Sequence, residues 1–363
     1  MIRRPPRSTQ SRSSAASDVY KRQLLNNTTG NYNTGVGYQA ASTHTTGDNI
    51  TAIGYNALQQ NTTASNNTAV GYNSLTANTT GAFNVAVGAL ALDANTTANF
   101  NTAIGESALT DNTTGANNTG VGYNALGDNT TGTQNVAIGA LTLDANTTSS
   151  NNSAVGHATL SDNTGESNTA IGRAALNANT TASNNTAVGK DALLVNTTGT
   201  QNTAVGSRAL DANTTANQNT AVGFEALEDN TGSYNTGVGY LALTKNTTAT
   251  YNTGLGYNAG ASITTGTRNV AVGALAFIAN TTGDNNVAIG VNALLVNTTG
   301  GSNVAVGRDA LGSATDSHTN VAVGYGALRD NTGGSSNTTF YFHYDNNQLS
   351  VGNVSAVSYT HLR

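Results

Sequence analysis

The chain has 363 residues, of which 9% are charged and 41 are glycine, with a formal net charge of −5 and no cysteine. The lack of cysteine excludes disulfides and thiolate chemistry, and the acidic balance argues against nucleic acid or an anionic membrane as a partner. No apolar run approaches the roughly 18–20 residues of a transmembrane helix, so we expect no membrane insertion of this segment.

The two ends differ from the rest of the chain. Residues 1–23 hold both prolines and the single methionine. They resemble the translation of sequencing-adapter DNA, and so do residues 356–363. We interpret 1–23 as a non-native leader and 356–363 as a non-native tail. A basic arm that binds nucleic acid is the alternative for the leader, which is rich in arginine.

Between residues 37 and 324 a glycine recurs at every seventeenth position, except that two of the intervals are one residue shorter. Such a period indicates one structural element stacked about eighteen times, each copy depending on its neighbours for a core. We therefore assign residues 24–336 to a single repeat domain.

The consensus repeat reads N-T-A-V-G-Y-N-A-L-x-x-N-T-T-G-x-x. Val, Ile or Leu precedes every repeat glycine, and Leu lies four residues after it in fifteen repeats. β-Branched residues favour short strands, whereas Asn and Gly favour sharp corners and disfavour a helix. Each repeat has room for two strands and two corners. The pattern predicts an all-β fold, a parallel β-solenoid or β-roll of about 18 coils, with equivalent residues about 4.8 Å apart.

We expect the residue before the glycine and the leucine after it to fill the interior. The Ala or Gly two residues before the glycine would then form a smooth face for contact with other chains, and the Asn four residues before it would form an amide ladder. The predicted structural core comprises Val36, Ile53, Val70, Val87, Ile104, Val121, Leu58, Leu75, Leu92, Leu109 and Leu126.

Aromatic residues often follow the repeat glycine, where exposed rings would stack on glycans. Packing at the coil corners or between chains is the interpretation we favour. The candidate glycan-facing residues are Tyr38, Tyr55, Tyr72, Tyr123, Tyr240 and Tyr257.

Acidic residues such as Asp93, Asp111 and Asp128 gather five or six residues after the glycine. They would form either weak Ca²⁺ sites or, as we favour, a solvated acidic edge. The five histidines fall in different phases of the repeat, and no Ser/His/Asp set converges. The sequence therefore predicts no catalytic, cofactor or metal site and no enzyme.

Residues 337–355 leave the repeat pattern at N-T-T-F-Y-F-H-Y. Alternating aromatic residues followed by D-N-N predict a β-hairpin that opens a different β module.

The motif NTGVGYNAL at 118–126 and the NTTG corners resemble repeats of phage tail-fibre proteins that end in an endosialidase-type intramolecular chaperone. The core N-[ST]-x-[AVG]-[IV]-G is similar to head repeats of YadA-type trimeric autotransporter adhesins, although those repeats are shorter than the repeat of this chain. The resemblance covers about residues 26–336. It implies a left-handed, homotrimeric β-roll displayed on a virion tail fibre or a bacterial cell surface, with a host glycan or protein as receptor.

The sequence thus favours a structural, non-catalytic fibre or adhesin segment that supports attachment to a host surface. The alternative is a carbohydrate- or ice-binding β-solenoid module. An ice-binding face needs a regular Thr array, and Val replaces Thr three residues before the glycine in six repeats. An enzyme would need a charged cleft that breaks the repeat, and the sequence shows none.

Overall fold

A computed structural model describes residues 22–341, in which nineteen parallel strands and no helix are present. The chain forms a parallel β-solenoid of about 18 turns, one for each repeat of the sequence, which confirms the predicted fold class. Contacts divide it into two compact units, Met1–Ser149 with β1–β7 and Ser150–Arg363 with β8–β19. The coils are described within each unit.

Every strand has three residues, and in β1–β18 these directly precede the repeat glycine. The strands of the first unit are β1 Thr34–Val36, β2 Thr51–Ile53, β3 Thr68–Val70, β4 Val85–Val87, β5 Thr102–Ile104, β6 Thr119–Val121 and β7 Val136–Ile138. Those of the second unit are β8 Ser153–Val155, β9 Thr169–Ile171, β10 Thr186–Val188, β11 Thr203–Val205, β12 Thr220–Val222, β13 Thr236–Val238, β14 Thr253–Leu255, β15 Val270–Val272, β16 Val287–Ile289, β17 Val304–Val306, β18 Val321–Val323 and β19 Thr338–Phe340.

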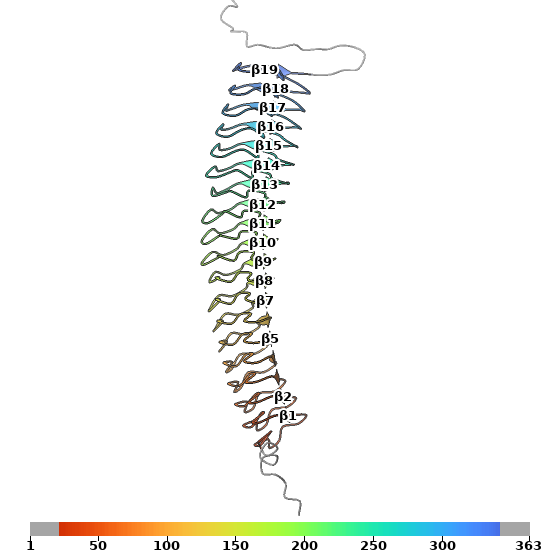
Figure 1. Ribbon diagram of the computed structural model, residues 1–363, viewed down its shortest axis with the longest axis vertical. Coiled ribbons are helices and arrows are strands. Elements are labelled where there is room, and N and C mark those ends of the chain that lie inside the picture. Colours follow the sequence, from red (N-terminus) through yellow and green to blue (C-terminus); the bar gives the residue numbers. More distant parts are fainter. Residues whose placement is uncertain (1–21, 342–363) are drawn as a thin grey trace, which may run out of the picture. The chain divides into compact units, whose positions relative to one another are not determined.

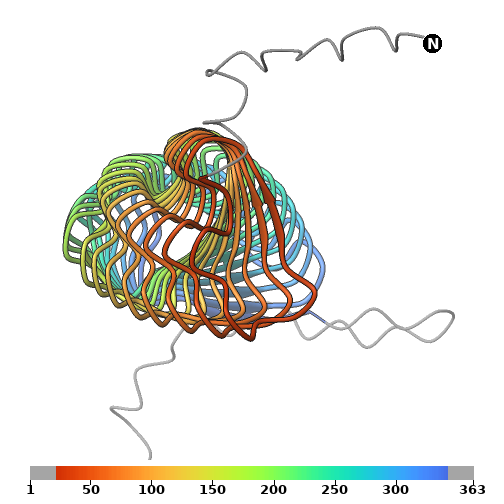
Figure 2. The same cartoon turned by 90° about the horizontal axis from the view of Figure 1, so that it is seen from below.

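Within each unit the strands stack in strict register, so that equivalent residues of successive coils are partners (Figure 1). In β10 and β11, for example, Thr186 lies opposite Thr203. The two shortened coils keep this register between β8 and β9 and between β12 and β13. Their missing residue lies in the corner, which reads N-T-G instead of N-T-T-G at 163–165 and 230–232. Seen end-on, coils of one unit overlay as similar loops (Figure 2).

Each coil contains one strand, not the two that we predicted. The segment after the glycine is a succession of turns, and its leucine adopts a left-handed conformation, with φ of 50° at Leu58 and 52° at Leu75. A residue with positive φ cannot continue a strand. The N–H of Leu58 instead donates to the carbonyl of Ser74 in the next coil, at 3.1 Å, so the turns are also linked from coil to coil.

The repeat glycines have φ between +120° and +143°, a region that is essentially restricted to glycine. Their backbones also stack closely. A Cβ added to Gly206 would lie 2.1 Å from the carbonyl oxygen of Gly223. The period of the sequence is therefore enforced by two independent requirements at the same position, and glycine alone meets both.

The predicted core residues fall into two sets, of which the leucines are buried and the residues before the glycine are not. The leucines are fully buried, as predicted for Leu58, Leu75, Leu92, Leu109 and Leu126. The prediction is wrong for Val36, Ile53, Val70, Val87, Ile104 and Val121, which point outward and are partly or largely exposed.

The physical reason is the alternation of strand side chains between the two faces. In β5, Ala103 is fully buried while Ile104 is 41% exposed. The alanine that we expected to contact other chains thus faces inward. A one-residue difference in assignment exchanges the two faces of a strand.

The predicted boundary at residue 337 is also wrong, because β19 continues the solenoid. Thr338 lies opposite Val321 of β18, and the N–H of Asn337 donates to Oδ1 of Asn320 at 2.8 Å, the same bond that Asn320 makes with Asn303 one coil earlier. Tyr341 stands where the repeat has glycine. The hairpin predicted for the residues after 341 lies outside the described part, as do residues 1–21 of the leader and the tail at 356–363.

Candidate functional site: the side-chain columns of the coils

Within each unit the outward face of the strands carries a row of apolar side chains, and we call these side chains together the outer valine column. Its exposure in the single chain ranges up to 53% at Val36. Exposed apolar rows of this kind mark interaction surfaces more often than isolated apolar residues do. The column consists of Val36, Ile53, Val70, Val87, Ile104, Val121, Ile138, Val155, Ile171, Val188, Val205, Val222, Val238, Leu255, Val272, Ile289, Val306 and Val323.

A second outward position lies two residues earlier in each strand and is usually Thr. In the four consecutive strands β15–β18 it is Val, at Val270, Val287, Val304 and Val321. Both outward positions are then apolar, so this stretch presents the most hydrophobic part of the face. Such a face is typical of a sheet covered by another layer.

The asparagines four residues before the glycine point into the coil and hydrogen-bond there to neighbouring coils. Asn101 is fully buried, and its N–H, its Oδ1 and its Nδ2 each make a hydrogen bond. Its N–H donates to Oδ1 of Asn84, its Oδ1 accepts the N–H of Asn118, and its Nδ2 donates to the carbonyl of Gly115, each at 2.9 Å. These side chains thus extend the backbone ladder by one amide per coil, which satisfies buried polar groups that no strand neighbour reaches.

A second column, seven residues after the glycine, forms a side-chain amide ladder. Nδ2 of Asn95 donates to Oδ1 of Asn78 at 2.9 Å, and Nδ2 of Asn112 donates to Oδ1 of Asn95 at 3.0 Å. His44 takes this position in its coil, fully buried, with Nδ1 at 2.8 Å from Nδ2 of Asn61. The sequence placed this asparagine at a corner, and hydrogen bonds between equivalent asparagines of successive coils make it an interior residue.

The aromatic residues also stack from coil to coil. Tyr38 and Tyr55 have ring centroids 5.3 Å apart, and Tyr55 and Tyr72 5.5 Å apart, with the ring planes within 14° of parallel. Tyr55 therefore has an aromatic neighbour on both ring faces. Tyr240 lies in the same way between Phe224 and Tyr257.

This stacking divides the six candidate glycan-facing tyrosines into two groups. A sugar stacks on the face of a ring, and the faces of Tyr55 and Tyr240 are already covered by neighbouring rings. Tyr123 differs, because Glu106 and Ala140 occupy the equivalent positions of the adjoining coils and the residue is 55% exposed. Stacked pairs contribute about 0.5–1.5 kcal/mol each beyond the area they bury, so the ladders stabilise the coils.

Part of the acidic edge is neutralised by ion pairs. Arg208 pairs with Asp211, with Glu225 at 2.8 Å and with Glu228, and Lys245 pairs with Asp229 at 2.8 Å. The carboxylates raise the pKa of Arg208, with Glu228 as the largest contributor, while burial raises the pKa of Glu228. These pairs link successive coils across the second unit's corner.

In the first unit the edge stays purely acidic. Burial, and then the charge of Asp111, raise the pKa of Asp93, partly offset by a hydrogen bond from Thr110 at 3.0 Å. No group of three or more His, Cys, Asp or Glu side chains within residues 22–341 could hold a metal ion.

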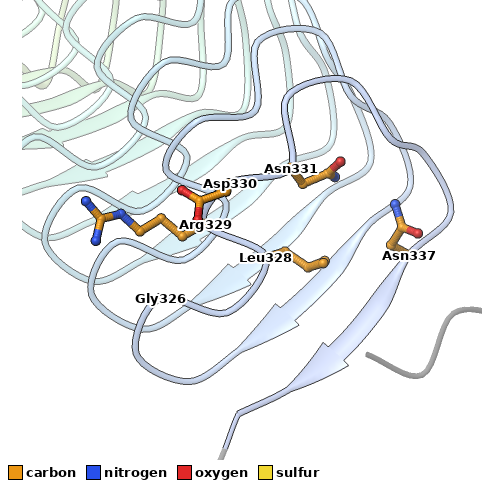
Figure 3. A pocket seen from close by; sticks show the side chains of 6 residues that line it. All are labelled: Gly326, Leu328, Arg329, Asp330, Asn331 and Asn337. Atoms are coloured by element: carbon orange, nitrogen blue, oxygen red, sulfur yellow. The ribbon is translucent and has the colours of Figure 1, made fainter. Parts of the chain in front are cut away.

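One surface hollow lies at the last described coil, between the turns that follow β18 and the start of β19. Leu328, Asn331 and Asn337 point into the coil, whereas Arg329 and Asp330 point away from it (Figure 3). Leu328 is half-buried here, while its equivalents in inner coils are fully buried. The hollow thus lies at the last described position of the leucine column, and its lining offers no convergent acid, base and nucleophile.

No family model matches the chain, and no curated protein matches it. Within the described range, no helix has the length and apolar character needed to cross a membrane.

Proposed function

We propose that this chain is a structural, surface-displayed segment of a fibre or adhesin, the shaft or head of a phage tail fibre or trimeric adhesin, which supports host attachment without catalysis. The observation that carries the proposal is the outer valine column, a regular apolar row turned toward solvent in the single chain. The resemblance of the N-T-x-V-G repeats to tail-fibre and adhesin repeats supports the same assignment, including display on a virion or a bacterial cell surface.

The partner of this face is the chain itself, in a homotrimer. Three identical columns packed around a common axis bury the exposed part of these side chains. Each Val or Ile is already about half buried or more in the single chain, so it contributes only a part of the about 1.5–3 kcal/mol that full burial gives. Strands β15–β18, with Val at both outward positions, carry the largest share of this contact. A left-handed coil follows from the same resemblance.

Size-exclusion chromatography with light scattering tests the assembly. The full chain is expected to elute as a trimer. Replacing Val272, Ile289 and Val306 together by Thr keeps β-branched residues on the strands but removes apolar area, so the trimer should dissociate. The same change at Val195 and Val291, which are also exposed but lie outside the strands, serves as control. A monomeric parent protein would contradict the proposal.

A carbohydrate-binding module is the second candidate, favoured by the exposed and unstacked ring of Tyr123. It predicts binding on a glycan array that Tyr123→Ala abolishes and that does not depend on trimer formation. Ice binding is less favoured, because the outward Thr column is replaced by Val through β15–β18. In the fibre proposal the receptor is a host glycan or surface protein, and the trimer binds host cells.

A further inference from the structure

The stacked tyrosines have a chemical property that the structural role does not use. Four tyrosine pairs are stacked: Tyr38–Tyr55, Tyr55–Tyr72, Tyr240–Tyr257 and Tyr234–Tyr251. The last is the closest, with centroids 4.9 Å apart and ring planes 6° from parallel. All members are exposed except Tyr38, which is half-buried. The pairs therefore combine close, parallel phenols with access for an oxidant.

We propose that these pairs are sites of oxidative cross-linking, in which neighbouring coils become joined by dityrosine. The coupling needs two phenoxyl radicals held side by side, and the in-register coils hold each ring against its equivalent one repeat away. This inference rests on the ring geometry of the single chain and is independent of the proposed fibre function.

The reaction balances with hydrogen peroxide as oxidant and a peroxidase as catalyst. Each phenol loses one electron and its hydroxyl proton, and the peroxide takes up two electrons and two protons to give two water molecules. The two radicals form a carbon–carbon bond between the ring positions ortho to oxygen. The two hydrogens on those carbons then move to the oxygens and restore both phenols, so each cross-link removes two hydrogen atoms from the protein.

The product would be a covalent cross-link between neighbouring coils. Tyr234 and Tyr251, like Tyr240 and Tyr257, are one full repeat apart in sequence. A bond that closes such a loop restricts the unfolded chain and therefore stabilises the folded one. We expect the cross-linked protein to unfold at a higher temperature than the untreated protein.

The chain supplies its own internal controls. Tyr123 is exposed, but its ring stacks on no aromatic ring among residues 22–341. Tyr325 has Arg308 over its ring, with the guanidinium carbon 6.0 Å from the centroid. Phe83 and Phe100 form a stacked pair without hydroxyls, which shows that Phe fits the column of Tyr234 and Tyr251.

The test treats the dilute full chain with peroxidase and hydrogen peroxide, then locates cross-linked peptides by mass spectrometry and follows dityrosine fluorescence. The expected result is intrachain peptides that pair Tyr234 with Tyr251 and Tyr240 with Tyr257. Tyr251→Phe keeps the stack and should abolish the first of these while leaving the second, and Tyr123→Phe should change neither. Cross-links that form equally at Tyr123, or a chain that yields none between stacked partners, would overturn the proposal.

Discussion

The glycine column offers the sharpest test of the coil geometry, through Gly206→Ala in the middle of the second unit. Gly206 has φ of +142°, and an added Cβ would lie 2.1 Å from the carbonyl oxygen of Gly223. Holding alanine in this region of φ costs about 1–3 kcal/mol. The clash is with backbone, so relief requires the two coils to separate.

Separation weakens the hydrogen bonds between these two coils, from Gly223 N–H to the Val205 carbonyl at 2.8 Å and from Glu225 N–H to the Ser207 carbonyl at 3.0 Å. Each contributes about 1 kcal/mol. The expected destabilisation is therefore about 3–5 kcal/mol, a large fraction of the typical stability of a domain.

The matched control is Gly326→Asn. Gly326 has φ of +62°, a Cβ there meets nothing within 4 Å, and Asn occupies the same repeat position at Asn258 with φ of 52°. Urea unfolding followed by circular dichroism should show a marked loss of stability for Gly206→Ala and little change for Gly326→Asn. Equal midpoints for the two variants would refute the reasoning.

Three further predictions concern the side-chain columns. Leu109→Ala should lower the stability measured by thermal unfolding by about 2–5 kcal/mol, because a buried leucine is removed. Ile104→Ala on the outer face should lower it by about 1 kcal/mol or less in the monomer. A larger loss for Ile104→Ala than for Leu109→Ala would favour the sequence-based prediction that the residue before the glycine is buried. Asn101→Ala leaves the buried N–H of Asn118 without its partner, while the Gly115 carbonyl keeps the Nδ2 of Asn112 as a donor, so the change should cost about 1–3 kcal/mol. Asn117→Ser, at the exposed position next to Asn118, should be nearly neutral by the same urea titration. Burial raises the pKa of Asp93 above 3.8 in the folded state, so its contribution to stability is complete below pH about 3.8 and is lost as the pH rises through the folded pKa. Asp93→Asn should therefore raise the unfolding temperature at pH 7 and change it little near pH 3, and a gain of equal size at both pH values would exclude this cause.

The period, the parallel stacking and the leucine column could be read from the sequence because glycine and leucine recur at fixed positions. Which strand residues face the interior could not be predicted from hydrophobicity, since in V-A-V strands such as β17 all three residues are apolar. Three residues give one alternation only, and the narrow interior selects alanine over the bulkier valine on either side. An amide ladder was predicted for the asparagines four residues before the glycine. The burial of the asparagines seven residues after it was missed, because this burial depends on amide partners in neighbouring coils and not on polarity.

The central claim is that like residues of successive coils are partners, with Thr and Val outward and Ala inward. The chain has no cysteine, so paired cysteines test it directly. Thr186 and Thr203 are strand partners, about 4.8 Å apart in Cα position, a separation that a disulfide spans. The account predicts that Thr186→Cys with Thr203→Cys forms an intrachain disulfide on mild oxidation, and that Thr186→Cys with the inward Ala204→Cys does not. Oxidation of the second pair in preference to the first would contradict it.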